Sequence, residues 1–229
     1  MSTTRIALVL LGVAGGLGVG VASGLAARDG QGPRVSLRTG DKVLAAKANL
    51  RVSDLPDGWT AITSEPIGKD FLLACEWLNP DLSKATITGL DAKTFVEKEE
   101  AQQASSLIVV FRTRHDAMTA YATDYSLYFD KCVTPSVGHT RGGLRVLGAQ
   151  RLRLVTTAGA RVTAGRTIVD LGGNQGARVK GVVDQVVVLR GRTIVVLDFQ
   201  GTDTALTDPV GLSLENSLVR LLVTRLPAG

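Results

Sequence analysis

The chain has 229 residues, 45% of them hydrophobic, which is enough apolar material for a folded core and excludes a disordered protein. Its net charge of +5 conceals two unequal parts. Residues 54–130 hold 13 acidic and 6 basic residues, whereas residues 141–200 hold 3 acidic and 10 basic ones. Only 4% of the residues are aromatic, and a basic segment without interleaved aromatic side chains disfavours nucleic acid as a partner.

The amino-terminal residues 1–27 predict export. Residues 6–27 carry no charge and follow the basic Arg5. A run of this length is either the core of a cleaved signal peptide or an uncleaved transmembrane anchor. The anchor is favoured because the run is long and has no convincing cleavage site. On a helix, Gly12, Gly16, Gly20 and Gly24 form a ridge of small residues that lets membrane helices pack and self-associate, whereas in a signal peptide their spacing is chance. Either way, we expect the rest of the chain outside the cytoplasm, secreted or held by a single span with its carboxyl terminus outside.

Two cysteines, Cys75 and Cys132, lie in the part of the chain that we expect to be exported. In an oxidising compartment they most simply form one disulfide bond. The loop it closes spans 57 positions, so the bond stabilises the fold by about 4 kcal/mol in the chain-entropy model. Two sulfurs without a CxxC or a nearby histidine do not make a zinc site, and we expect no metal and no cofactor.

The first elements after the apolar run are a linker, a turn, a helix and a strand. Residues 28–49 mix Gly, Pro and charge, which predicts a linker before a domain that spans residues 50–229. The sequence DLPDGW at residues 54–59 predicts a turn. Residues 70–78 have helical spacing, and the apolar run at residues 105–111 predicts a buried strand.

A second helix is predicted to begin at Thr113, a residue type that caps helix starts. Its spacing places Met118, Tyr121, Tyr125 and Phe129 on one face, with Cys132 just past its end. The three tyrosines of this helix have an apolar ring and a polar tip, which suits either a core or the wall of a ligand cleft. The candidates for the ligand cleft are Tyr121, Tyr125 and Tyr128.

The second half of the chain predicts strands and turns, followed by a helix. Alternating or continuous apolar patterns predict strands at residues 144–156, 161–171, 182–189 and 193–199. Arg190-Gly191-Arg192 predicts a hairpin turn, and Pro209 begins an amphipathic helix with leucine at 214, 218, 221 and 222. The order of elements predicts an α+β fold, with an antiparallel β-sheet of about four to six strands and helices packed on one face.

The arginines of this half suggest a basic surface. The candidates are Arg151, Arg153, Arg190 and Arg192, on a sheet that would face anionic envelope lipid, wall polymer or an acidic protein. Alternatively, the basic and acidic parts of the chain face one another.

No set of residues predicts catalysis. His115 and His139 have no Ser, Cys or carboxylate at an interpretable spacing. The glycine-rich residues 172–176 lie between two strands and lack the Lys and Ser/Thr of a phosphate loop.

The chain resembles the exported sensor-type domains of actinobacteria, such as the extracellular domain of the mycobacterial serine/threonine kinase PknH. The resemblance covers roughly residues 50–226 and rests on DLPDGW at 54–59, Ala74-Cys75 in an early helix, the strand at 105–111 and the helix ending in Lys131-Cys132. It implies a compact α+β domain with a cleft for an unidentified envelope ligand. The chain departs from this family in having one cysteine pair where the kinase domain has two disulfides, and we expect no kinase in this chain.

These observations lead to two functional hypotheses. The first is a non-enzymatic, sensor-like domain of the cell envelope that binds a lipid, wall fragment or small amphiphile in a cleft near the helix of Tyr121–Tyr128. The second is a membrane-anchored interaction or scaffold protein that self-associates through its glycine-spaced helix and binds a protein partner through the basic sheet, which makes a homo-oligomer an expected state.

Overall fold

The computed structural model describes residues 32–62, 81–99, 102–141, 144–154, 159–172, 179–202 and 209–227. The predicted signal or anchor segment with its four glycines and the predicted helix at residues 70–78 lie outside the described residues, as does Cys75. The same holds for most of the glycine-rich loop at residues 172–176. Within the described ranges, no helix is both long and apolar enough to cross a membrane.

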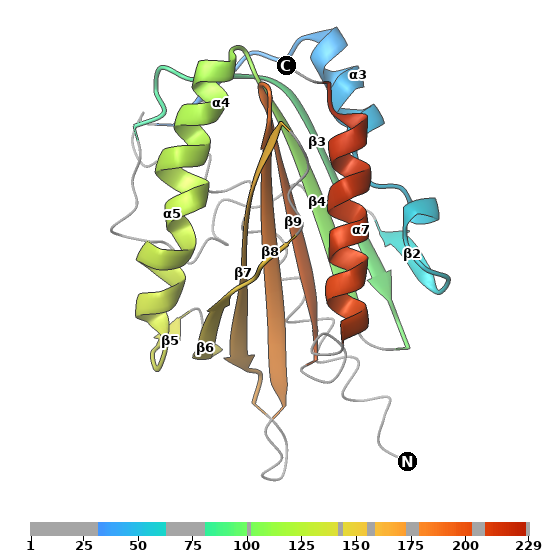
Figure 1. Ribbon diagram of the computed structural model, residues 1–229, viewed down its shortest axis with the longest axis vertical. Coiled ribbons are helices and arrows are strands. Elements are labelled where there is room, and N and C mark those ends of the chain that lie inside the picture. The colour runs from blue at the N-terminus through green and yellow to red at the C-terminus, as the bar shows by residue number, and fades with distance from the viewer. Residues whose placement is uncertain are drawn as a thin grey trace.

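A twisted β-sheet forms the centre of the domain (Figure 1). In the described part of the chain it has nine strands in the order β1-β3-β4-β9-β8-β7-β6-β5, with β2 paired to β3 off this path. All pairs are antiparallel except β1 with β3. The strands are β1 (Arg34–Val35), β2 (Trp59–Ile62), β3 (Thr86–Glu97), β4 (Gln102–Phe111), β5 (Thr140–Arg141), β6 (Leu144–Arg151), β7 (Ala160–Asp170), β8 (Lys180–Arg190) and β9 (Thr193–Thr202).

The antiparallel α+β class is confirmed, and so are the strand at β4 and the hairpin of β8 and β9. The hairpin pairs Arg190 with Thr193 across a two-residue turn, in which Gly191 has a φ of 58°. The predicted number of four to six strands was too low. The longest strand that the sequence reading missed is β3, where Gly89 and Asp91 interrupt the apolar pattern. Gly89 is required there because a Cβ would clash with the backbone oxygen of Asp41.

Part of the predicted linker is folded. Residues 28–49 include β1 and the helix α3 (Thr39–Ala48). Ala45 and Ala48 are buried in the main core, while the charged Lys42 and Lys47 lie on the exposed side of the helix. The composition indicated a linker because the inner side of this helix combines Asp41 with small alanines and the partly buried Leu44, which leaves a weak apolar pattern.

Helices cover both faces of the sheet, so the prediction of helices on one face was wrong. Alternate residues of β4, β8 and β9 contact α3 and α7 (Pro209–Arg225) on one side, which we call the α7 face. The residues in between face α4 (Arg114–Ala120) and its continuation on the other side, the α4 face. These strands are apolar at successive positions, as in Leu107–Phe111, and a strand of that kind is buried on both sides.

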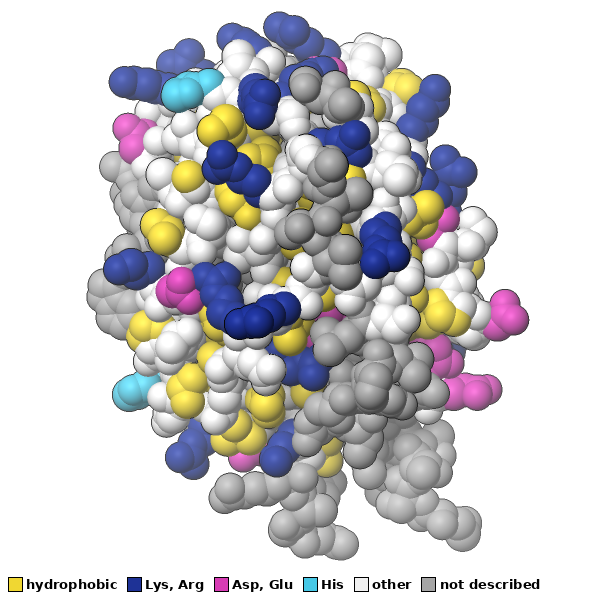
Figure 2. Space-filling view, in the orientation of Figure 1, with side chains coloured by type: hydrophobic (Ala, Val, Ile, Leu, Met, Phe, Trp, Pro, Cys, Tyr) yellow, Lys and Arg dark blue, Asp and Glu magenta, His cyan; other side chains and the backbone are white. Residues whose placement is uncertain are grey.

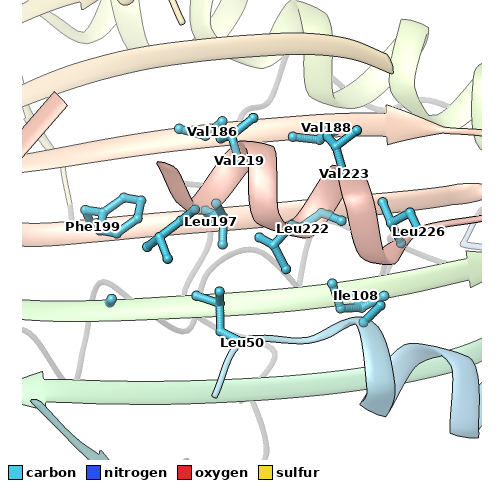
Figure 3. Close-up of a cluster of buried hydrophobic side chains, with 14 of the residues drawn as sticks. Leu50, Ile108, Val186, Val188, Leu197, Phe199, Val219, Leu222, Val223 and Leu226 are labelled. Carbon is cyan, nitrogen blue, oxygen red and sulfur yellow. The ribbon is translucent and has the colours of Figure 1, made fainter. Parts of the chain in front are cut away.

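The main core lies between α7 and the sheet (Figure 3). Val219, Leu222 and Val223 of α7 pack over Val186 and Val188 of β8 and over neighbouring residues of β9 and β4. The predicted start of this helix at Pro209 is confirmed, and so is its apolar stripe, in which Leu218 and Leu222 are fully buried. The closing helix is therefore held by aliphatic packing along its length.

The helix on the opposite face begins as predicted, because the Oγ1 of Thr113 accepts a hydrogen bond from the backbone N–H of Asp116 at 3.0 Å. Beyond Ala120 its hydrogen-bonding pattern changes from α-helical to partly π-helical. A π-helical segment η3 (Tyr121–Tyr125) is followed by α5 (Ser126–Tyr128), a second π-helical segment η4 (Phe129–Val133) and the 3-10 turn η5 (Thr134–Ser136). Cys132 thus lies inside the second π-helical segment, where it is buried, rather than past the helix end.

Phe129 packs directly on Gly165 of β7, and this contact makes a testable prediction. Replacing Gly165 with alanine would drive a Cβ into the ring of Phe129, so we expect the unfolding free energy to fall by about 2 kcal/mol. Chemical denaturation followed by circular dichroism measures the change. The matched control is Gly148→Ala on β6, where the added Cβ meets Ile168 at an ordinary 3.7 Å. Equal effects of the two substitutions would contradict the predicted contact.

Candidate functional site

The α4 face of the sheet changes from apolar to polar along its strands. Its apolar half lies against Ala117, Ala120 and Tyr121 of the covering helix. Beyond it, towards the start of β4 and the end of β9, the same face carries five polar side chains. We call this group the polar patch; it consists of Gln103 and Ser105 of β4, Gln185 of β8, and Asp198 and Gln200 of β9.

The strand register brings these side chains together. Ser105 pairs with Asp198, and Asp198 pairs with Gln185, so the three form one row across adjacent strands. Gln103 and Gln200 pair in the next row on the same face, since alternate residues of a strand point to the same side. Directly opposed side chains lie about 5 Å apart at their Cβ atoms. The patch therefore concentrates amide, hydroxyl and carboxyl groups from three strands.

Asp198 is the charged group of the patch. It is 4% exposed, and its Oδ1 accepts a hydrogen bond from the Nε2 of Gln185 at 3.1 Å. Burial raises the pKa of Asp198 from 3.8 to about 7, against the lowering effect of the Gln185 hydrogen bond. The carboxyl group is therefore divided between its neutral and ionised forms near neutral pH.

Gln200 is 5% exposed, and neither its Nε2 nor its Oε1 has a hydrogen-bond partner among the described residues. A buried amide of this kind costs about 1–3 kcal/mol for each unsatisfied group. Elsewhere in the patch, the Nε2 of Gln103 donates to the Oγ of Ser105 at 3.4 Å. Gln200 thus offers a free donor and a free acceptor side by side.

Phe129 and Arg151 border the patch. The row of Ser105, Asp198 and Gln185 continues to Gly165 of β7 and Arg151 of β6, and the ring of Phe129 covers Gly165. The guanidinium of Arg151 lies 5.1 Å from the centroid of that ring. Arg151 also forms an ion pair with Asp130 at 2.7 Å, so a cation and an aromatic ring close one end of the row.

The predicted cleft residues are only partly placed by the structure. Tyr121 is buried against the apolar half of the α4 face, and its hydroxyl lies 2.6 Å from the Oγ1 of Thr163. It stabilises the contact between helix and sheet. The side chains of Tyr125 and Tyr128 lie outside the described residues.

Three of the four arginines predicted as a basic surface have partners within the domain. Arg151 is paired with Asp130, and Arg190 at the β8–β9 turn donates a hydrogen bond to the backbone oxygen of Val223. Arg192 binds Asp41 of α3 through two hydrogen bonds of 2.5 and 2.9 Å. Arg153 is exposed. Three of the four arginines therefore hold parts of the domain together.

A second polar cluster lies on the α7 face. Arg166 of β7 and Asp184 of β8 are opposed in the register and form a buried bidentate ion pair at 2.7 and 2.5 Å. Glu215 of α7 is buried beside them. Burial and the neighbouring Asp184 raise the pKa of Glu215 to about 9, with Arg166 acting in the opposite direction. Neither carboxyl oxygen of Glu215 has a hydrogen-bond partner among the described residues, so the Glu215 carboxyl group is buried beside the ion pair without being held by it.

The sequence reading did not identify either cluster. Asp198 lies between Leu197 and Phe199, and the Asp184-Gln185 pair lies between the apolar residues 182–183 and 186–189. A charged residue within a continuous apolar run indicates a buried group with a specific partner, and this signal was available. The partners themselves come from other strands, so no local pattern reveals them.

No protein-family model matches the sequence, and neither does any curated protein. A search of solved structures finds proteins of similar fold at low identity. The extracellular domain of PknH from Mycobacterium tuberculosis aligns with a TM-score of 0.43 and 10% identity over 80% of this chain and 96% of that one.

Two further structures are similar in fold. An uncharacterized Rv0999 ortholog from Mycobacterium smegmatis aligns with a TM-score of 0.39 and 14% identity, over 80% of this chain and 97% of that one. The Ran-binding protein Mog1p of Saccharomyces cerevisiae aligns at 0.31 and 11%, over 76% and 87%. The resemblance to the PknH domain is thus confirmed at the level of the fold.

The two buried acids predict how stability depends on pH. Because the pKa of each is higher in the folded protein, the folded state holds a proton that the unfolded state has lost, so the contribution of these two groups to stability is fully present below the unfolded pKa and is lost as pH rises through the folded pKa. The fall runs from about pH 3.8 to about 7 for Asp198 and from about pH 4.5 to about 9 for Glu215. We expect Asp198→Asn and Glu215→Gln to reduce this fall, each in its own pH window.

Urea denaturation of the three proteins at about pH 5, 7 and 9 measures the effect. We expect Asp198→Asn to remove about half of the difference between pH 5 and 7, to which both groups contribute, and Glu215→Gln to reduce the fall in both intervals and to remove nearly all of it between pH 7 and 9. A wild-type protein whose stability does not change over this range would contradict the assignment of both carboxyl groups.

Proposed function

We propose that this chain is an extracytoplasmic, sensor-like domain that binds a small ligand at the polar patch without transforming it. The observation that carries the proposal is Gln200, a buried amide whose donor and acceptor have no hydrogen-bond partner in the part of the chain that the structure describes, two positions along β9 from Asp198. Buried polar groups of folded proteins are nearly always satisfied. A ligand that hydrogen-bonds to Gln200 and Asp198 would satisfy these groups.

The surroundings of the patch favour an amphiphilic ligand. One half of the α4 face is polar, whereas the adjoining half is apolar and the ring of Phe129 lies at the border. Binding sites for small molecules usually combine apolar walls with a few polar groups that orient the ligand. A lipid, a wall fragment or a small amphiphile has this division within one molecule.

The chemistry of the patch favours binding over catalysis. Four of its five members are amides or a hydroxyl, which donate and accept hydrogen bonds and are poor acids and bases. We therefore expect the ligand to be recovered unchanged.

We further propose the disulfide bond and the export that the sequence predicts. Cys132 is buried in the π-helical segment η4, and Cys75 is the other cysteine of the chain. A disulfide between them would tie the segment around Cys75 to the α4 helix near the polar patch.

The ligand is tested by native mass spectrometry of the full chain, exported and purified from an actinobacterial host. We expect an additional discrete mass that is released on denaturation. Gln200→Leu should reduce its occupancy about tenfold, since the ligand loses two hydrogen bonds. Thr193→Val is the matched control, because its hydroxyl is equally buried and without a partner, but lies on the α7 face.

The proposed function is wrong if neither the wild-type protein nor the Gln200→Leu variant carries a bound mass and the substitution only stabilises the protein. Gln200 is then an unsatisfied core residue. If both substitutions lower the occupancy equally, the ligand binds elsewhere.

The disulfide and the export segment are tested on the same preparation by intact mass. We expect the non-reduced chain to be about 2 Da lighter than the reduced one. The mass also shows whether residues 1–27 are retained. Two free thiols in the exported protein would contradict the proposed bond.

A further inference from the structure

The residues that follow the apolar amino-terminal run form an unusual surface. Between residues 34 and 51 the structure has five exposed basic residues: Arg34, Arg38, Lys42, Lys47 and Arg51. The acidic residue of this stretch is Asp41, which is buried and paired with Arg192. The stretch therefore presents positive charge without exposed negative charge.

Exposed apolar side chains lie between these basic residues. Val35 is 65% exposed, Leu37 48% and Val43 45%. Of the eight large hydrophobic residues that are exposed in the described part of the chain, four lie between residues 35 and 52. Such concentration in a short stretch indicates a surface that contacts another apolar medium.

The outer side of α3 shows this alternation most clearly. Its exposed residues from Lys42 onwards are Lys42, Val43, Ala46 and Lys47, so two lysines flank a small apolar strip. The inner side is anchored to the sheet by Ala45, Ala48 and the ion pair of Asp41 with Arg192. The helix is therefore held in place with its basic and apolar side outward. We call Arg34, Val35, Leu37, Arg38, Lys42, Val43 and Lys47 the amino-terminal surface.

Further basic residues extend this surface. Arg34 pairs with Thr86, and the backbone N–H of Arg112 donates to the carbonyl of Thr86, so the two arginines lie on either side of one residue. Arg114 follows at the start of α4. The acids near this end are Asp81 and Asp116, so the balance stays positive. Dark blue side chains gather at the upper end of Figure 2, where Figure 1 places α3 and the start of α4.

The position of this surface in the chain identifies its partner. Only residues 28–33 separate the uncharged residues 6–27 from Arg34. Six residues span at most about 21 Å when fully extended. If residues 6–27 lie in a membrane, the amino-terminal surface is held within that distance of the bilayer, at a high effective concentration.

We propose that the amino-terminal surface binds an anionic lipid bilayer, with Val35, Leu37 and Val43 at the level of the headgroups and the basic side chains against the phosphates. Interleaved basic and apolar residues are typical of segments that lie in the membrane interface. Each Lys or Arg near an anionic surface strengthens binding by about fivefold. This contact would orient the domain on the membrane and is independent of the ligand proposed for the polar patch.

The test uses the full chain in lipid nanodiscs made of phosphatidylcholine alone or with about 30% phosphatidylglycerol. Exposed lysines are acetylated for a short time, and the rate at each lysine is read by mass spectrometry. We expect Lys42 and Lys47 to react more slowly by about threefold or more in the anionic discs, and about 0.5 M NaCl to restore their rate. Lys98 and Lys180, at the opposite end of the sheet, are the internal controls and should react equally in both.

Two variant pairs complete the experiment. In anionic discs we expect the wild-type chain to be protected from limited proteolysis at Arg34 and Val35. Lys42→Glu with Lys47→Glu should remove this protection, whereas Lys98→Glu with Lys180→Glu should leave it unchanged. Equal reaction of Lys42 and Lys47 in neutral and anionic discs would overturn the proposal. So would recovery of the exported protein without residues 1–27, because the surface would then have no tether.

Discussion

Strands β4, β8 and β9 carry apolar side chains on both faces of the sheet, and the other layers of the domain depend on covering these two faces. The α7 face is closed by α7 and α3, and the α4 face by α4 and its π-helical continuation. Close packing sets the positions of these helices, as the contact of Phe129 with Gly165 and the passage of α3 over Gly89 show. The ion pair of Arg192 with Asp41 joins α3 to the β8–β9 turn, and Arg225 joins α7 to Asp54 in the same way.

The two polar clusters break this apolar pattern in different ways. On the α7 face, Arg166 and Asp184 satisfy one another as a bidentate ion pair, while Glu215 lies buried beside them with neither carboxyl oxygen hydrogen-bonded among the described residues. Within the described residues of the α4 face, Gln200 has no such partner, and Asp198 has only Gln185. A buried polar cluster whose hydrogen bonds are incompletely satisfied costs stability, which is consistent with a role in binding a ligand. The ligand is placed on the α4 face because Gln200 presents both a donor and an acceptor there, on the same face as the Asp198 carboxyl group and at the border of an apolar surface.

The polar patch and the amino-terminal surface lie on different parts of the domain and suit different partners. The patch is buried and offers a few directed hydrogen bonds, which suits one small molecule. The amino-terminal surface is exposed, basic and apolar, which suits an extended anionic interface. A domain held on the membrane by one surface would keep the other in a constant position relative to the bilayer.

The sequence alone determined the class of the fold, the β4 strand, the β8–β9 hairpin and the starts of the helices at Thr113 and Pro209. These features depend on neighbouring residues: a capping hydroxyl, a proline, a glycine at a turn or a continuous apolar run. The role of α3, the covering of both faces and the polar patch were decided only by the tertiary structure. Asp198 and Gln185 are brought together by strand pairing, Asp41 and Arg192 lie 151 positions apart, and such contacts leave no periodic trace in the chain.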